Sequence, residues 1–396
     1  MKRILFAIAA LLACVAGGGL LVQRLLTDRD AADDSHFARN ETQLLVSGNS
    51  NAHVRLYRAG ARLADTLLLT TDPGQPLWLP TGNYFLMSLI HGRRMYTPVV
   101  LTGYHSGPDE DGSFLVSLRP PPVGFPPRLR ADEAEYVFIP GGNALVGDRQ
   151  TPHEPHYVWL TGYFIAPFEV TNGEFRLFIA DSAGYNDDRN WSGEGRRWKL
   201  GATAHSTALL RKGDEEYARF GSDDEPLTQV TWFEANAYCR WLTNKIGEHR
   251  WLFSLPTDPE WEKAARGPDN FDYSLGMTIS DDGAGFYNWR KNSNAPVSVI
   301  GREATKRLFA ANRFGLFHMT GNVTEWSQSV NVPYGRERPY TDDERNHDDT
   351  HGLRSVRGGS WYSASIAYLY IPYRDAFQPE HSNQELGFRI VARALP

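Results

Sequence analysis

Two neighbouring stretches, PLTQVTWFEANAYCRWL at residues 226–242 and SLPTDPEWEKAARG at residues 254–267, decide what this sequence can fold into. Each contains a Thr followed three residues later by a Glu, and apolar residues then recur at helical spacing. Such a pair predicts a capped helix start, because the two side chains satisfy backbone N–H groups that have no partner inside the helix. Three pairs of this kind occur: Thr171 with Glu174, Thr231 with Glu234 and Thr257 with Glu260. The helices are expected to end near Gly184, Gly247 and Gly267.

The composition favours a fold rich in loops and aromatic residues around these few helices. The chain has 396 residues, of which 41% are hydrophobic and 22% charged, with 11 Trp, 18 Tyr, 20 Phe and 36 Gly. A chain of this length predicts two folded units, because single cores stop growing at about 250 residues. The net charge of -6 is spread without basic blocks, so nucleic acid is not expected as a partner.

The N-terminus has the pattern of a membrane-targeting segment. Lys2 and Arg3 precede an uncharged run over residues 4–22. Residues 1–26 are interpreted in three ways: a signal anchor, a lipoprotein signal peptide with Cys14 as the lipidated residue of the lipobox-like LLAC, or a cleaved secretory leader. All three place the rest of the chain on the periplasmic or extracellular side of a bacterial membrane. Beyond Cys14 the chain has only Cys239, which excludes an internal disulfide in the mature chain and is expected to be buried.

The middle of the chain changes character three times before the C-terminal domain begins. Residues 27–42 are polar and acidic, which is typical of a tether. Residues 43–118 contain short alternating apolar runs separated by Gly and Pro turn signals, which predict a small all-β sandwich. Its LWLPTGNYFL stretch loosely resembles the PEGA and carboxypeptidase-regulatory-like repeats. Residues 119–130 are rich in proline and predict an extended linker to a domain over residues 131–396.

Seven motifs in that last domain occur in a fixed order and carry a family resemblance. They are FIPGGNALVGD (138–148), EPHYVWLTGYFIAPFEVTNGEF (154–175), PLTQVTWFEANAYCRWL (226–242), SLPTDPEWEKAARG (254–267), FGLFHMTGNVTEW (314–326), VRGGSW (356–361) and ELGFRIVA (385–392). In order and spacing they resemble the sulfatase-modifying-factor, or formylglycine-generating-enzyme, family. The resemblance implies an α+β fold of the C-type-lectin kind, with little regular structure and with structural calcium.

The cysteine chemistry of that family is missing. Family members that oxidise a sulfatase cysteine bind copper through two cysteines after the GGS motif, since thiolate is the ligand type that holds Cu(I). Here Ser363 stands at the first of these positions, and the second falls near residues 366–368, where no Cys occurs. Copper is therefore not expected, and formylglycine-generating activity is predicted to be absent. No catalytic residue is assigned.

Calcium is the cofactor that the resemblance supports. At one site the resemblance implies the carbonyls of Gly321 and Val323, the Glu325 carboxylate, and His318 at a position where Asn or Asp is usual. The second implied site uses Asn288 and the Trp289 carbonyl, together with Asn292 or Asn294. Hard cations such as calcium require oxygen clusters of this kind.

The same motifs imply a substrate groove. Its residues are expected to be Thr324, which replaces the usual groove Trp, and Ser360, Trp361, Ser363, Arg374 and Arg389. For Arg374 and Arg389 two roles remain open. They tie loops together through bidentate bonds, or they face the groove and select an acidic peptide or carboxylate.

One acidic loop, TDDERNHDDTH at residues 341–351, lies outside the family pattern. Its two His and several Asp are a transition-metal pattern, but no regular spacing fixes them on one face, so a solvated loop is favoured.

Two functional hypotheses follow. The first is a tethered binding or accessory module for an envelope protein or peptide, comparable to the gliding-motility lipoproteins and type VI secretion accessories of the family. The second is a periplasmic oxidative enzyme similar to the pyoverdine-chromophore-maturing branch. The sulfoxide synthases of the family use histidines on an N-terminal helical domain, where this chain has a β pattern, so their activity is not expected here.

Overall fold

The computed structural model describes most of the chain beyond residue 40. The described residues are 41–47, 54–60, 66–71, 75–90, 93–102, 114–131, 133–148, 150–151, 154–202, 206–279, 287–290, 298–335, 340, 346–348 and 351–396. The predicted leader, Cys14 and the tether up to residue 40 lie outside them. Within the described ranges, no helix has both the length and the apolar character needed to cross a membrane.

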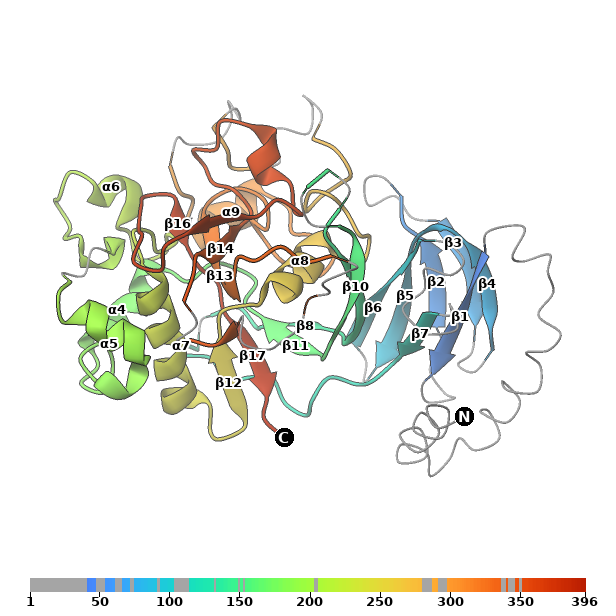
Figure 1. Ribbon diagram of the computed structural model, residues 1–396, viewed down its shortest axis with the longest axis horizontal. Helices are drawn as coiled ribbons and strands as arrows, with labels where there is room; N and C mark the ends of the chain where they lie inside the picture. The colour runs from blue at the N-terminus through green and yellow to red at the C-terminus, as the bar shows by residue number, and fades with distance from the viewer. Residues whose placement is uncertain are drawn as a thin grey trace.

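The N-terminal β unit, residues 41–118, contains two sheets that share one hydrophobic core (Figure 1). One sheet has the order β4-β1-β7, and the other has the order β3-β2-β5-β6. Alternation explains the shared core, because Leu44 and Val46 of one sheet and Val54 and Leu56 of the other point inward and are at most 2% exposed. The strands are β1 (Glu41–Ser47), β2 (Val54–Arg58), β3 (Thr66–Thr71), β4 (Leu77–Pro80), β5 (Gly82–Ile90), β6 (Arg93–Leu101) and β7 (Phe114–Ser117).

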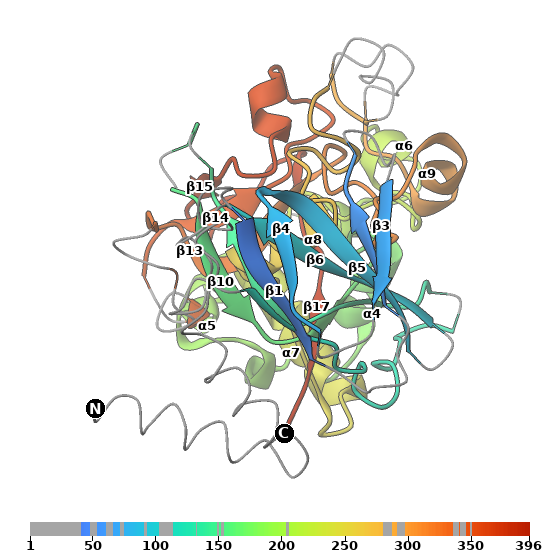
Figure 2. The same cartoon turned by 90° about the vertical axis from the view of Figure 1, so that its right-hand side faces the viewer.

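This unit lies directly against the C-terminal body, as Figure 1 shows, and in Figure 2 it faces the viewer in front of that body. Tyr157 of the body packs against the core of the unit, and its hydroxyl donates to the Val100 carbonyl at 2.6 Å. The Arg313 guanidinium lies 4.7 Å from the ring centre of Phe85 on the outer face of the second sheet. The two parts therefore touch through specific polar and aromatic contacts.

The proline-rich segment between them packs on the body instead of standing free. Phe125 makes an edge-to-face contact with Phe164, and Leu129 also packs against the main core. The Val123 carbonyl accepts a hydrogen bond from Arg250. The segment is irregular, as expected from its prolines, but its apolar residues join the fold of the body.

The body contains three small sheets, with the orders β10-β9, β12-β17-β11-β8 and β15-β14-β13-β16. Strand β17, close to the C-terminus, pairs with both β11 and β12, so the end of the chain closes the second sheet. The strands are β8 (Val137–Ile139), β9 (Gly142–Val146), β10 (His156–Leu160), β11 (Tyr163–Ile165), β12 (Trp251–Ser254), β13 (Thr324–Val330), β14 (Arg354–Arg357), β15 (Asp375–Phe377), β16 (Leu386–Gly387) and β17 (Val391–Ala394).

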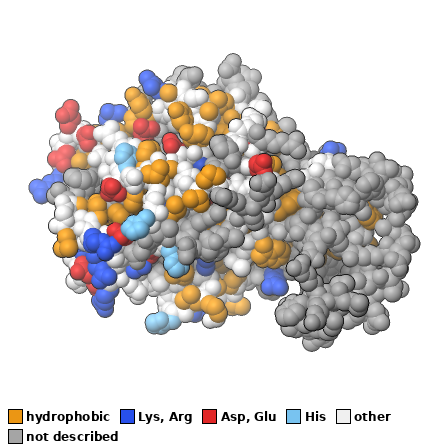
Figure 3. Space-filling view, in the orientation of Figure 1, with side chains coloured by type: hydrophobic (Ala, Val, Ile, Leu, Met, Phe, Trp, Pro, Cys, Tyr) orange, Lys and Arg blue, Asp and Glu red, His pale blue; other side chains and the backbone are white. Residues whose placement is uncertain are grey.

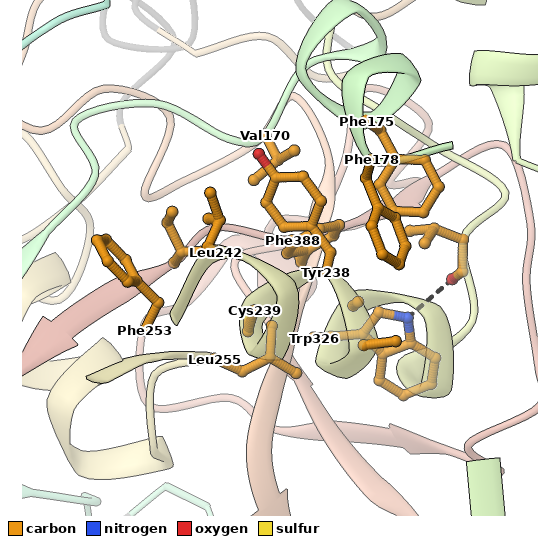
Figure 4. Packing of buried hydrophobic residues seen from close by; sticks show 14 of the residues in the cluster. Val170, Phe175, Phe178, Tyr238, Cys239, Leu242, Phe253, Leu255, Trp326 and Phe388 are labelled. Atoms are coloured by element: carbon orange, nitrogen blue, oxygen red, sulfur yellow. Dashed lines mark hydrogen bonds between the residues drawn. The ribbon is translucent and has the colours of Figure 1, made fainter. Parts of the chain in front are cut away.

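The three predicted capped helices are confirmed. Thr171, Thr231 and Thr257 each cap a helix, and in each case the Glu three residues later bonds back to the cap. These helices are α4 (Asn172–Ala180), α7 (Trp232–Ile246) and α8 (Asp258–Arg266); the others are α5 (Gly193–Lys199), α6 (Tyr217–Phe220) and α9 (Arg302–Leu308). The main core forms where α4 and α7 meet the sheets (Figure 4).

Aromatic side chains dominate that core and use their polar atoms within it. Tyr238 and Trp241 on α7 pack against Phe178 on α4, with ring centres 5.4–5.8 Å apart. The indole of Trp326 on β13 donates to the Val230 carbonyl at 2.9 Å, which is the dashed bond in Figure 4. Cys239 is buried among these residues, as predicted, and burial raises the pKa of its thiol far above the usual range.

Candidate functional site

A groove opens where the strand ends of the sheet β15-β14-β13-β16 converge. Strands β13 and β14 are antiparallel, and so are β14 and β15. The start of β13, the end of β14 and the start of β15 therefore lie at the same end of the sheet. Thr324, Arg357 and Asp375 occupy these three positions and contribute to the groove wall. The fold therefore gathers side chains that are up to 51 residues apart in sequence, between positions 324 and 375.

The groove encloses about 290 Å³ and has aromatic walls. Tyr362 and Tyr368 rise at its edge, where they are 45% and 43% exposed, and Ile366 beside them is 37% exposed. Contiguous apolar side chains that are exposed beside a groove are typical of a surface that contacts a ligand or a partner. The full lining is Arg290, Thr324, Val356, Arg357, Gly358, Gly359, Tyr362, Ser363, Ala364, Tyr368, Tyr373, Asp375, Phe377, Asn383, Glu385 and Leu386.

The GGS turn shapes one wall through backbone geometry. Gly359 has φ +67, and a Cβ at that position would lie 2.7 Å from the Tyr368 carbonyl oxygen, so only glycine fits there. The turn then places Ser360 and Ser363 in contact, since the Ser360 N–H donates to the Ser363 hydroxyl at 2.9 Å. The Ser360 hydroxyl donates in turn to the Glu385 carboxylate at 2.5 Å.

The charged residues of the lining are two carboxylates, Asp375 and Glu385, and two arginines, Arg290 and Arg357. Within the described part of the chain, neither carboxylate forms an ion pair with a basic side chain. Burial raises the pKa of Tyr373, and the nearby charge of Asp375 raises it further. Arg290 lies at the groove with its guanidinium 4.8 Å from the ring centre of Tyr362, while the buried Arg357 is held by Glu262 at 2.6 Å.

Arg374 and Arg389, which the sequence places at the groove, do not line it. Arg374 pairs with Asp258 at 2.7 Å and also donates to the Ser355 hydroxyl. Arg389 is fully buried and forms a bidentate pair with Glu325, with contacts of 2.6 and 2.7 Å. Both therefore have the loop-tying role, and an acidic ligand loses the support that a groove-facing arginine would give it.

Glu325, which was predicted to bind calcium, pairs with Arg389 instead. Its two carboxylate oxygens accept from Arg389, and one also accepts from the Trp261 indole at 2.7 Å. The His318 side chain bonds to Thr305 at 2.8 Å, and its pKa is lowered to about 3 by burial and then by the Arg389 charge. A buried guanidinium already supplies the positive charge here, so these residues do not fit a calcium ion.

The second predicted calcium position has a different character. The Asn288 side-chain amide donates to the Ser298 carbonyl and to Asn322, both at 2.9 Å. The side-chain oxygen of Asn288, Oδ1, is buried and has no hydrogen-bond partner among the described residues. An unsatisfied buried oxygen is the kind of ligand that a hard cation takes up. Asn292 and Asn294, the other side chains considered for this site, lie outside the described residues.

The remaining predicted site residues are structural or lie beside the groove. Trp361 is 5% exposed, packs with Val323 and Phe220, and contacts the lining residue Tyr362 without lining the groove itself. Gly321 approaches the backbone of Asn288 so closely that a Cβ would lie 2.5 Å from the Asn288 carbonyl oxygen. Of the six predicted groove residues, Thr324 and Ser363 line the groove, and Ser360 supports its wall.

Parts of the acidic loop are anchored, where a solvated loop was favoured. The Asp348 carboxylate accepts from Asn236 and Arg240 of α7 and from Gln328 of β13. Asn346 bonds to Ser329 at 2.7 Å. No group of three or more His, Cys, Asp or Glu side chains suited to a metal occurs among the described residues, which omit 341–345, 349 and 350 of this loop.

Sequence reasoning missed most of the groove wall. Tyr362, Tyr368 and Tyr373 follow the GGSW motif closely, and this concentration of rings could have marked them. Glu385 is the first residue of the ELGFR motif. Asp375 follows Arg374 directly, but only Arg374 was predicted to be a groove residue.

Fold and site together define a mixed α/β protein with an aromatic groove beside a GGS turn. The sequence model of the "Sulfatase-modifying factor enzyme 1-like domain" family matches residues 124–394. The chain belongs to this family, as its motifs predicted.

The chain is similar to curated proteins that have several different names. The chain is 28% identical over 371 residues to "Hercynine oxygenase" of Mycolicibacterium smegmatis, covering 87% of this chain and 78% of the relative. It is 25% identical over 305 residues to "Inactive C-alpha-formylglycine-generating enzyme 2" of Mus musculus, covering 68% and 90%. It is 28% identical over 263 residues to "Serine/threonine-protein kinase pkn1" of Chlamydia caviae, covering 64% of this chain but only 37% of that protein.

Among solved structures, Treponema denticola variable protein 1 is similar with a TM-score of 0.48 and 21% identity, covering 67% of this chain and 97% of the other.

Proposed function

We propose that this chain is a binding module of the bacterial cell envelope that holds a protein or peptide segment in its groove and does not generate formylglycine. The observation that carries the proposal is the chemistry of the groove wall. Ser363 stands there with its hydroxyl bonded to the Ser360 N–H, and aromatic rings surround it. A hydroxyl cannot replace a thiolate as a ligand for Cu(I).

The other cysteine of the sequence does not compensate. Cys239 lies in the core on α7 and is 1% exposed. No cysteine follows it in the sequence, so no thiol from the later motifs can reach the groove. A family relative that is named inactive supports the idea that the fold persists without the oxidative reaction.

Tethering is part of the proposal. The uncharged run after Lys2 and Arg3 supports a membrane attachment, as an anchor or through a lipid on Cys14. Such an attachment would hold the groove on the periplasmic or extracellular side, where nucleic acid is not a partner. Mass spectrometry of the native N-terminus tests this: an intact Met1 means an anchor, a diacylglyceryl Cys14 means a lipoprotein, and a terminus beyond residue 14 without lipid contradicts tethering.

The test of the main proposal uses the full chain in mild detergent with copper and a sulfatase-motif peptide containing cysteine. We expect no aldehyde above a control without protein. The same protein should bind peptides in solution, measured by fluorescence anisotropy. Aldehyde formation would refute the loss of activity, and absence of peptide binding would refute the binding role.

An oxidative enzyme is the second candidate, because the relative named hercynine oxygenase aligns with 87% of this chain. Oxygen uptake with phenolic or thiol substrates, in the presence of iron or copper, separates the two. Turnover would favour the oxidative enzyme over the binding module.

A further inference from the structure

The carboxylates around the groove fall into two groups that differ in their partners. Asp258, Glu262 and Glu325 lie beneath it, are fully buried, and each pairs with an arginine. Asp375 and Glu385 line the groove itself, are half-buried, and have no basic partner among the described residues. The fold therefore pairs the carboxylates below the groove with arginines and leaves the two groove carboxylates without an ion pair among the described residues, with Arg290 as a further charged group of the lining.

Their local bonds leave both groove carboxylates able to receive a cation. Asp375 accepts only its neighbour's N–H, that of Ala376, at 2.8 Å among the described contacts. Glu385 accepts the Ser360 hydroxyl through one oxygen, Oε2. A carboxylate has about four acceptor positions, so each retains capacity for a donor.

The aromatic walls suit a cation for a second reason. Ring faces attract ammonium and guanidinium groups, and this attraction grows as water is excluded. Arg290 shows the effect at the groove edge, where its guanidinium lies over Tyr362. The other arginine of the lining, Arg357, is held by Glu262 and by the carbonyls of Pro372 and Tyr373, so it does not neutralise the groove carboxylates.

We propose that the groove selects a peptide segment through a lysine or arginine side chain that pairs with a carboxylate of the lining, Asp375 or Glu385. The aliphatic stem of that side chain packs against the tyrosines, as long basic side chains do on apolar surface. Residues on either side of it contact Tyr362 and Tyr368, which are exposed at the edge. This inference rests on the proposed binding function and adds the chemical class of the ligand.

The test measures binding of three fluorescein-labelled peptide pools to the full chain in mild detergent. The pools are acetylated, amidated heptapeptides that share random Ala, Leu, Ser and Tyr positions and differ in a fixed central residue: lysine, norleucine or glutamate. We expect the lysine pool to bind about tenfold more tightly than the norleucine pool, with the glutamate pool weakest. The preference should shrink as salt is raised.

Two groove variants and one matched control locate the effect. Asp375→Asn and Glu385→Gln remove a charge while keeping an acceptor oxygen, and each should reduce the lysine preference several-fold. Glu380→Gln removes an equally negative but exposed charge that is not part of the lining and should leave the preference unchanged. Melting curves check that each variant is folded, and having two separate groove variants protects the test against one failing to fold.

The outcomes separate this inference from the proposed function. Equal binding of the lysine and norleucine pools overturns the inference but leaves peptide binding intact. An unchanged lysine preference in a folded variant that combines Asp375→Asn with Glu385→Gln does the same. Binding of none of the pools overturns the proposed function as well.

Discussion

The layer beneath the groove and the wall of the groove use the same residue types in opposite ways. Beneath it, Glu262 and Glu325 are held in buried pairs of 2.6 Å by Arg357 and Arg389, of which Arg357 also reaches the groove wall. In the wall, Asp375 and Glu385 have no such partner among the described residues. The comparison teaches that the arginines of the family motifs are paired within the fold. The two groove carboxylates, Asp375 outside the motifs and Glu385 at the start of ELGFR, are the groups that the proposed ligand would reach.

On the face shown in Figure 3, basic and acidic groups are intermixed, mainly toward the end that carries α4, α5 and α6. Exposed pairs of this kind contribute little to stability. The contrast between base and wall can therefore be tested by removing one charge at a time.

The largest effect is expected when the buried pair is broken. Arg389→Met leaves the Glu325 carboxylate buried with only the Trp261 indole as donor, and should cost about 3–5 kcal/mol of unfolding free energy. Urea denaturation measures this loss. Arg240→Met, which removes a pair with Asp348 that is more exposed, should cost under about 1 kcal/mol. Equal losses in the two variants would show that burial does not distinguish these pairs.

Calcium is expected to act at Asn288 and not at Glu325. At a calcium concentration about 100 times the dissociation constant, a single site would stabilise the fold by about 2.7 kcal/mol. Melting curves with calcium and with chelator measure the shift, and Asn288→Ala should abolish it while His318→Ala should not. A chelator without effect on the melting curve of the wild-type protein would contradict a calcium site at Asn288.

Whether the sequence predicted an interaction depended on how far apart its two residues are along the chain. The capped helices were predictable because Thr257 and Glu260 are three residues apart and meet through the helix itself. The pair of Glu325 and Arg389 spans 64 residues, and nothing in either motif indicates that they meet. Both motifs were read correctly as family features, but their two side chains were assigned to separate sites.

The groove wall was harder to predict for the same reason. Asp375 begins β15 and Glu385 directly precedes β16, the two outer strands of one four-stranded sheet, and strand order cannot be read from periodicity. Alternation did predict the short strands of the N-terminal β unit, although β1 begins at Glu41, within the segment expected to be a polar tether. Thr42 is 1% exposed there, because polar residues can face a core when their neighbours are apolar.

A pH-dependent effect is expected from Glu169, which lies in the same buried layer. Its pKa is raised from 4.5 to about 7, first by burial, with Arg389 opposing and Glu325 reinforcing the rise. The folded chain therefore keeps a proton that the unfolded chain has lost, so this group makes stability fall as pH rises from about 4.5 to about 7. Glu169→Gln should gain roughly 2 kcal/mol relative to wild type over that interval.

Comparing the two proteins at each pH cancels the titration of other groups. The change of this difference with pH is also independent of any fixed cost of the amide, which can still accept the bond from Asn322. Urea denaturation at pH 4.5, 6 and 8 provides the measurement. A difference that stays constant with pH would mean that Glu169 titrates normally in the folded state.

A smaller effect is expected at the cap of α8, the helix that carries Asp258 and Glu262. Thr257→Ala removes the hydroxyl that accepts the Glu260 N–H and donates to the Glu260 carboxylate. The loss should be about 1 kcal/mol, and Thr257→Ser should recover most of it. A loss above about 3 kcal/mol would show that the cap also positions the buried ion pairs.

The smallest effect is expected in the wall of the groove, where the comparison is sharpest. Asp375→Asn removes a half-buried carboxylate that has no basic partner among the described residues, so no ion pair is lost. The bond from the Ala376 N–H can be kept by the amide oxygen. The unfolding free energy should therefore change by less than about 0.5 kcal/mol, or rise slightly as repulsion within the groove is relieved. If this variant loses as much stability in urea as Arg389→Met, Asp375 is a structural residue, and the division between a paired base and an open wall fails.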